Sequence, residues 1–339
     1  EAGEHALLGA MVRLADGDGF VFTGRLSLEE QPWLADHVVF GQVLFPGTGF
    51  LDLALHVGMQ VGAPQVEELT IEAPLILAPK QSVALQVSVK ESDASGARAL
   101  TIHAKAEGAS TWTLHASGRV GGESSESSFD ARMWPPAGAE EVELGDVYAR
   151  LEAQGLAYGP SFRGLARAWR VAGVLVAEIR LPSASMAEGH VLHPALLDAA
   201  LHAFALDSTS EGVRLPFAWS GVSVDAVGAS VLRVRYSPKG EGAFELALAD
   251  ASGRALGRVE QLATRPASAA SLRDALTRRP IESLHRVAWR ELGKLEAKAA
   301  KTAVIGDVEL ARALGADAKA ALSEVGPEHE RAVLVCRGE

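Results

Sequence analysis

The chain has 339 residues, of which 48% are hydrophobic and 22% are charged, a composition that predicts a folded protein with more than one compact unit. Its net charge of -11 argues against a nucleic-acid-binding protein, because contacts with phosphates require clustered Lys and Arg. Cys336 is the single cysteine, which excludes an intrachain disulfide and a thiolate metal site and favours a cytoplasmic setting.

The ends of the chain and its longest apolar runs indicate whether the protein is secreted, membrane-bound or part of a longer polypeptide. The N-terminal residues lack the basic and apolar segments of a signal peptide, and no apolar run reaches the roughly 20 residues that a membrane span requires. We therefore expect a soluble protein. The chain begins without Met and stops within a regular pattern, so we also expect it to be a piece of a longer polypeptide.

The first region, residues 1–121, contains short runs of Val, Thr, Ile and Leu with a period near two. Gly, Asp and Ser separate these runs, a pattern that predicts antiparallel strands. One apolar segment differs. Residues 48–58 follow Pro46 and Gly47, and they are predicted to form a helix with Thr48 as its cap.

The second region, residues 142–268, repeats this plan after a linker predicted at residues 122–141, which is rich in Ser, Gly, Pro and acidic residues. Helices are expected at residues 147–156 and 194–206, with strands around them. The segments FLDLALH (residues 50–56) and LLDAALH (residues 196–202) match at five of seven positions. The sequence therefore predicts two similar halves, each a sheet around one apolar helix.

Beyond residue 268 the pattern changes. Residues 269–339 are predicted to form a linker followed by strand, helix and strand, the start of an α/β unit. The segment GDVELARALG in this region lacks the G-x-G-x-x-G fingerprint, which argues against a dinucleotide cofactor there.

The first candidate site is the motif H-x-x-x-G-x-x-x-x-P, formed by His37, Gly41 and Pro46. Val38, Val39 and Phe40 follow the histidine, and apolar surroundings favour a neutral imidazole that can act as a base. Pro46 precedes the predicted helix, whose first free amides could bind a carbonyl oxygen that gains charge. The alternative is an ordinary strand and turn in which His37 only packs.

The second candidate site lies on the predicted helix at residues 194–206, where Asp198 and His202 are four residues apart and share one face. Apolar surroundings favour the protonated, proton-donating form of a carboxyl group. Asp198 could instead be a hydrogen-bonded brace, and Asp52 with His56 forms the same pair in the first half. A metal site of His37, Asp198 and His202 is disfavoured, because no known ligand spacing accompanies them.

Two further segments carry candidate residues. Tyr158, Gly159 and Pro160 are predicted to form a turn in which the phenol could line a pocket. The segment LPFAW is predicted to form a stiff pocket wall that includes Pro216, Phe217 and Trp219. His193 is expected to be a turn or cap residue beside Pro194, whereas three other histidines give no sign of a role: His5, His103 and His115.

These motifs together resemble the dehydratase domains of modular polyketide synthases. The resemblance depends on H-x-x-x-G-x-x-x-x-P, YGPSFRGL (residues 158–165), HPALLDAALH (residues 193–202) and LPFAW (residues 215–219), which occur in the order and approximate spacing of that family. It covers the chain from its start to about residue 268. Residues 284–292, LHRVAWREL, are similar to the segment that opens the structural part of a ketoreductase region.

The resemblance implies an α+β double hotdog fold with the active site between the halves. It implies that His37 removes the α-proton of a β-hydroxyacyl thioester and that Asp198 protonates the departing β-hydroxyl. His202 and Tyr158 would bind that hydroxyl or orient Asp198, and Gly47, Thr48 and Gly49 would bind the thioester carbonyl through their amides. The substrate would arrive on the phosphopantetheine of an acyl carrier protein, and the domain itself would bind no cofactor or metal.

The family also implies a homodimer that works beside neighbouring synthase domains. Four other functions stay open at this point. The same site could serve a dehydrating cyclase, in which a distal hydroxyl adds to the new double bond, or a domain that only shifts double bonds, although such domains usually lack the acid. The fold could also serve as a non-catalytic docking or dimerisation module, or as a thioesterase.

Overall fold

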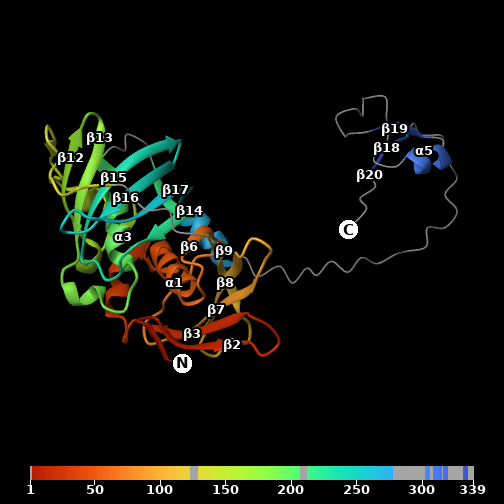
Figure 1. Ribbon diagram of the computed structural model, residues 1–339, viewed down its shortest axis with the longest axis horizontal. Coiled ribbons are helices and arrows are strands. Elements are labelled where there is room, and N and C mark those ends of the chain that lie inside the picture. The colour runs from red at the N-terminus through yellow and green to blue at the C-terminus, as the bar shows by residue number, and fades with distance from the viewer. Residues whose placement is uncertain are drawn as a thin grey trace. The chain divides into compact units, whose positions relative to one another are not determined.

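The architecture comes from a computed structural model, shown in Figure 1, which describes residues 2–122, 129–206, 212–277, 302–305, 308–314, 316–319 and 331–334. The chain divides into two compact units, residues 1–282 and residues 283–339. The first unit holds both predicted halves. In the described part of the chain, no helix is both long enough and apolar enough to cross a membrane.

A sheet of 14 strands runs through the first unit, in the order β1-β2-β3-β7-β8-β9-β6-β14-β17-β16-β15-β13-β12-β10. Neighbouring strands are antiparallel throughout, as the alternating sequence pattern predicted. In β7, for example, Val83, Leu85, Val87 and Val89 are buried and alternate with partly exposed residues, so one face of the strand lies on the core.

The seven strands at the N-terminal end of this order form the first half. They are β1 (Ala2–His5), β2 (Leu8–Arg13), β3 (Phe20–Ser27), β7 (Ser82–Ser92), β8 (Arg98–Ala106), β9 (Thr113–Gly121) and β6 (Gln65–Ile71). The other seven form the second half. They are β14 (Val213–Val224), β17 (Ala255–Ala267), β16 (Ala243–Ala249), β15 (Val231–Gly240), β13 (Val174–Arg180), β12 (Leu165–Val171) and β10 (Glu140–Val142).

The halves join where β6 pairs with β14, with Leu69 opposite Trp219 and Val66 opposite Val222. Each half wraps around one helix, α1 (Gly47–Gln60) in the first and α3 (Pro194–Leu201) in the second. Figure 1 shows these two helices beside each other, and they are in contact with one another and with strands of the large sheet. This arrangement confirms the double hotdog that the sequence predicted.

Helix α1 forms because residues 48–58 are mostly apolar and all buried. It begins at Gly47 with Pro46 at the N-cap, so the prediction that Thr48 caps the helix is wrong. Helix α3 is shorter than predicted. It ends at Leu201, and residues His202–Leu206 continue as a 3-10 helix, η4. A hydrogen bond joins the two helices, since the Thr48 hydroxyl donates to the Pro194 carbonyl over 3.0 Å.

A second sheet of three short strands also connects the halves, in the order β11-β4-β5. Strands β4 (His37–Val39) and β5 (Gln42–Val43) come from the first half, and β11 (Leu156–Tyr158) comes from the second. The 3-10 helix η1 (Pro32–Asp36) precedes β4. Helix α2 (Val147–Ala153) precedes β11, so the helix predicted at residues 147–156 ends earlier than expected.

The segment predicted as a linker is partly packed against the second half. Phe129 and Ala131 are buried against Ala247 and Ala249 of β16, and residues 140–142 form the edge strand β10. Residues 123–128 lie outside the described part of the chain. Two more 3-10 helices complete the second half, η2 (Pro160–Phe162) and η3 (Ala184–Ala187). Helix α4 (Ala269–Thr277) follows β17.

The second unit contains a parallel sheet in the order β19-β18-β20. Its elements are β18 (Thr302–Ile305), α5 (Val308–Leu314), β19 (Asp317–Lys319) and β20 (Arg331–Leu334). A helix between parallel strands is the α/β pattern that the sequence predicted. The ketoreductase-like segment at residues 284–292 lies outside the described residues, as does Cys336.

Candidate active site

His37 is held as a neutral base by its backbone surroundings. Phe40 and Gly41 both have positive φ, 49° and 78°, and their turn brings β5 and Leu44 back beside β4. The His37 Nδ1–H donates to the Leu44 carbonyl over 2.9 Å, so Nε2 carries the free lone pair. Burial lowers the pKa of the His37 imidazole below its ordinary 6.5, and the charge of Asp198 opposes this effect.

Asp198 faces this histidine from the other half. Its Oδ2 atom lies 3.8 Å from His37 Nε2, and the side chains of both residues are at most 8% exposed. Oδ2 is also 3.2 Å from Nε2 of His202, which caps the C-terminal end of α3. The four-residue spacing on the helix thus brings Asp198 and His202 together, as predicted. The other ring nitrogen of His202, Nδ1, is buried without a hydrogen-bond partner among the described residues.

Tyr158 lies in a strand, not in the turn that the sequence predicted. It belongs to β11 and pairs directly with His37 of β4. Its ring centroid lies 4.0 Å from that of His202 and 5.7 Å from that of His37. Burial raises the pKa of the Tyr158 phenol well above 10.0, so the group remains a neutral hydroxyl. The pairing of β11 with β4 thus brings Tyr158 beside His37, and α3 brings Asp198 and His202 to the same place.

A cavity of about 1540 Å³ surrounds this group and takes its lining from both halves. Pro216 lines it, as predicted, but Phe217 and Trp219 do not, so these two predictions are wrong. Trp219 is fully buried in the core, and the ring of Phe217 lies under the Arg265 guanidinium at 4.6 Å. Helix α4 also lines the cavity, through residues such as Leu272. Its residues were predicted to belong to the linker that follows the second half.

The glycine-rich start of α1 reaches the cavity at one residue. Gly47 lines it, whereas Thr48 and Gly49 do not. The Thr48 hydroxyl is engaged with Pro194, and the Gly49 amide donates to the Pro46 carbonyl over 2.9 Å. The Gly49 amide is therefore not available for a substrate carbonyl. A first-turn amide of a helix has no intrahelical acceptor, which leaves Gly47 as the best-placed donor of the three.

Gly159 and Pro160 support the site without lining it. The Gly159 amide donates to the Asp36 carbonyl over 2.8 Å, and a Cβ atom at this position would collide with the Asp36 carboxyl group. Ser161 donates its amide to Asp36 Oδ2 over 2.8 Å. The close approach that glycine allows therefore fastens the end of β11 to the residue before His37. Phe162 was not predicted as a site residue, but the centroid of its ring lies 5.0 Å from that of the His37 ring.

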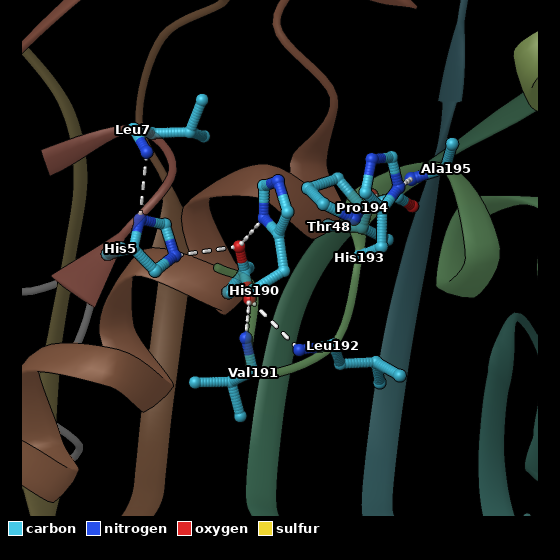
Figure 2. Close-up of polar contacts among 10 residues, drawn as sticks. His5, Leu7, Thr48, His190, Val191, Leu192, His193, Pro194 and Ala195 are labelled. Atoms are coloured by element: carbon cyan, nitrogen blue, oxygen red, sulfur yellow. Dashed lines mark hydrogen bonds and ion pairs between the residues drawn. The ribbon is translucent and has the colours of Figure 1, made fainter. Parts of the chain in front are cut away.

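The Asp52 and His56 pair does not repeat the arrangement of Asp198 and His202. Asp52 is bonded to His5 and His190, which the sequence did not connect with it (Figure 2). The expectation that His5 is incidental is therefore wrong.

His193 is a cap residue as predicted, since its Nδ1 atom accepts the Ala195 N–H over 3.1 Å.

Comparisons with known proteins agree with this geometry. A family model described as a polyketide synthase dehydratase domain matches residues 5–105, and one described as a polyketide synthase dehydratase N-terminal domain matches residues 126–274. The phenolphthiocerol synthesis polyketide synthase type I Pks15/1 of Mycobacterium marinum is 46% identical over 277 residues. This match covers 80% of the chain but only 13% of that relative.

Solved structures match over almost their whole length. A structure from work on dehydratase substrate selection in the borrelidin and fluvirucin polyketide synthases is 45% identical, with a TM-score of 0.76 over 79% of this chain and 97% of that one. The bifunctional dehydratase-cyclase domain of ambruticin biosynthesis is 44% identical, with a TM-score of 0.73 over 78% and 98%.

The CurK dehydratase of the curacin synthase is 27% identical, with a TM-score of 0.69 over 79% of this chain and 99% of that one. Its solved structures include two mutants described as inactive, one with phenylalanine in place of a histidine and one with asparagine in place of an aspartate. The chain belongs to the dehydratase domains of modular type I polyketide synthases, the hydro-lyases that remove water during polyketide chain extension.

Proposed function

We propose that His37 and Asp198 together eliminate water from a β-hydroxyacyl thioester. The observation that carries this assignment is the approach of two buried side chains, His37 Nε2 and Asp198 Oδ2, to 3.8 Å in a cavity that both halves line. A β-elimination requires a base that takes the α-proton and an acid that protonates the leaving hydroxyl, and this pair provides one group of each kind. The two inactive CurK mutants, which lack a histidine and an aspartate, support a pair of these residue types.

In this reaction His37 Nε2 takes the proton from Cα, and the C–H electron pair becomes the new Cα–Cβ double bond. The Cβ–O bond breaks as the protonated Asp198 donates its proton to the hydroxyl, which leaves as water. His37 is then protonated and Asp198 ionised. Nε2 and Oδ2 are 3.8 Å apart, so after the product has left a bridging water molecule can return the proton from His37 to Asp198.

Three neighbouring groups assist His37 and Asp198 in this proposal. His202 orients Asp198 through its Nε2 contact, and Tyr158 donates its neutral hydroxyl to the departing oxygen. The Gly47 amide at the start of α1 binds the thioester carbonyl, where negative charge develops. The substrate is carried on the phosphopantetheine of an acyl carrier protein. We propose that the domain works as a homodimer in the cytoplasm, beside other synthase domains.

The direct test is turnover of a β-hydroxyacyl thioester, bound to an acyl carrier protein or to pantetheine. We expect a product lighter by one water molecule, with an alkene between Cα and Cβ, detected by mass spectrometry and by absorbance of the conjugated thioester. Release of free acid would instead indicate a thioesterase. Recovery of unchanged substrate by a folded protein would contradict the proposal and favour a non-catalytic module.

A second candidate is a dehydrating cyclase, which the similarity to the ambruticin dehydratase-cyclase favours. The same assay with a substrate that carries a distal hydroxyl separates the two functions. A dehydratase gives the open alkene. A cyclase gives an oxygen ring of the mass of the alkene but without its conjugated absorbance, and the two products separate by chromatography.

The pH dependence of kcat/KM follows from the state of His37. Burial lowers its pKa, so the unprotonated base persists below its ordinary 6.5. We therefore expect the acidic limb of the profile to fall below pH 6.5, with rates lost only as the pH decreases further and Nε2 becomes protonated. The measurement is kcat/KM between pH 4.5 and 9 with a slow substrate, so that chemistry limits the rate. An acidic limb above pH 6.5 would contradict a desolvated base.

A further inference from the structure

Asp52 is a fully buried carboxylate that accepts four hydrogen bonds (Figure 2). Oδ2 accepts from His5 Nε2 over 2.9 Å and from His190 Nδ1 over 2.7 Å. Oδ1 accepts from the amides of Val191 and Leu192, each over 3.0 Å. Asp52 belongs to α1 of the first half, whereas three of its four partners belong to the second half.

The same three side chains, His5, Asp52 and His190, could bring ligand atoms within 4.8 Å of one another for a metal ion. The hydrogen bonds of His5 argue against such a site. Its Nδ1 atom accepts the Leu7 N–H over 3.1 Å, so the ring proton lies on Nε2, the atom that faces Asp52. A metal ion at Nε2 would require that proton to move to Nδ1, where it would face the Leu7 N–H. The cluster is therefore a hydrogen-bonded carboxylate.

The charge of Asp52 is stabilised by this set of donors. Burial by itself would raise its pKa, but the hydrogen bonds from His190 and His5 outweigh burial and lower the pKa below its usual value. The carboxylate is therefore ionised near neutral pH. A buried ionised group that loses its partners is costly, so the geometry of the segment that provides these donors is strongly restrained.

This segment leads directly to the catalytic acid. Residues 190–192 are followed by His193, the N-cap of α3, and by Pro194, its first residue. Thr48 binds the Pro194 carbonyl, and Asp52 lies one turn further along α1, so both contacts come from one face of that helix. Asp198 lies one turn after Pro194 on α3. Two neighbouring contacts from α1 thus fix the start of the helix that carries Asp198.

We propose that Asp52 is a positioning residue for the dehydration, because it fixes α3 against α1 and so sets the distance between His37 and Asp198. This inference rests on the proposed function of that pair. Asp52 makes no contribution to the cavity lining, so its effect passes through the position of Asp198. A displacement near 1 Å of a catalytic group can reduce a rate by about 10²-fold.

The test is Asp52→Asn in the full chain. The new amide can still accept from Val191 and Leu192, but its NH2 group faces the N–H of His5, so donor meets donor. We expect kcat to fall by about 10- to 100-fold, with KM changed by less than about threefold. The matched control is Glu178→Gln, which alters another buried carboxylate that binds Arg180 and does not line the cavity. This control should keep the wild-type kcat.

A second pair of variants keeps the inference testable if Asp52→Asn does not fold. In His190→Asn the amide NH2 can replace the Nδ1–H donor, whereas His190→Leu removes it. We expect His190→Asn to retain more of kcat than His190→Leu, with similar circular dichroism for both. A purely structural role would give equal kcat values per folded molecule, and that result would overturn the inference.

A readout without turnover separates this inference from the proposed function. NMR titration of the His37 imidazole in wild type and in Asp52→Asn should show midpoints that differ by at least about half a pH unit, because the pKa of His37 depends on the distance to its neighbours on α3 and on its desolvation. Identical midpoints together with wild-type kcat would refute the positioning role. Absence of dehydration in the wild type would refute the proposed function, whereas the titration would still decide whether Asp52 controls the pair.

Discussion

His37→Asn is expected to reduce kcat for dehydration by at least about 10²-fold, and up to about 10⁴-fold, the usual range for loss of a general base. The amide nitrogen of Asn occupies nearly the same place as Nδ1, so the hydrogen bond to the Leu44 carbonyl is retained. Nε2, the atom that faces Asp198, is lost. The variant therefore removes the base while it preserves the bond that orients the residue.

The control for this variant is His115→Asn. His115 also lines the cavity, and its Nδ1–H likewise donates to a backbone carbonyl, that of Ala73, over 3.1 Å. Its ring stacks on Phe50 and does not contact Asp198 in the described structure. We expect His115→Asn to lose much less activity than His37→Asn. Equal losses would show that any buried imidazole in the cavity matters, and the base would have to be reassigned.

Asp198→Asn is expected to produce a loss that depends on the leaving group. With a β-hydroxyacyl thioester, kcat should fall by about 10²- to 10⁴-fold, because hydroxide cannot leave without a proton. With a β-fluoroacyl thioester the loss should be far smaller, because fluoride leaves without protonation and His37 still removes the α-proton. The measurement is the rate of alkene formation from both substrates, together with fluoride release.

His37→Asn provides the contrast, since it should lose activity with both substrates. If Asp198→Asn lost the same factor with the fluoro and the hydroxy substrates, Asp198 would not be the proton donor. It would then act through binding or through the position of His37. Thermal unfolding of both variants checks that each remains folded, because Asp198 and His37 are buried and their contacts contribute to packing.

The sequence predicted the elements that have a strong local pattern. Both central helices could be located, because long apolar segments follow Pro46 and His193-Pro194 and no other part of the halves has that composition. The duplication of LDxALH indicated that each half has one such helix. Asp198 and His202 could be paired because a helix brings residues four apart onto one face.

The sequence could not show contacts that depend on distant pairing. Strand β11 has three residues, too few for a period of two to be visible, so the pairing of Tyr158 with His37 was missed. LPFAW was taken as one pocket wall because it is apolar, but it lies in β14, where the register shifts between Pro216 and Ala218, and of its five residues Leu215 and Pro216 alone line the cavity. Nothing in a single sequence connects His5, Asp52 and His190, which meet only after both halves fold.

The pairing of β6 with β14 makes the two halves one continuous sheet, and β4 with β11 joins them a second time. Rotation of one half against the other would break both ladders, so this enzyme should not use the jaw-like closure by which many two-lobed enzymes select their substrates. Recognition must then depend on the shape of a preformed channel. New specificity in this scaffold would arise by exchange of the side chains along that channel, with the catalytic pair left in place.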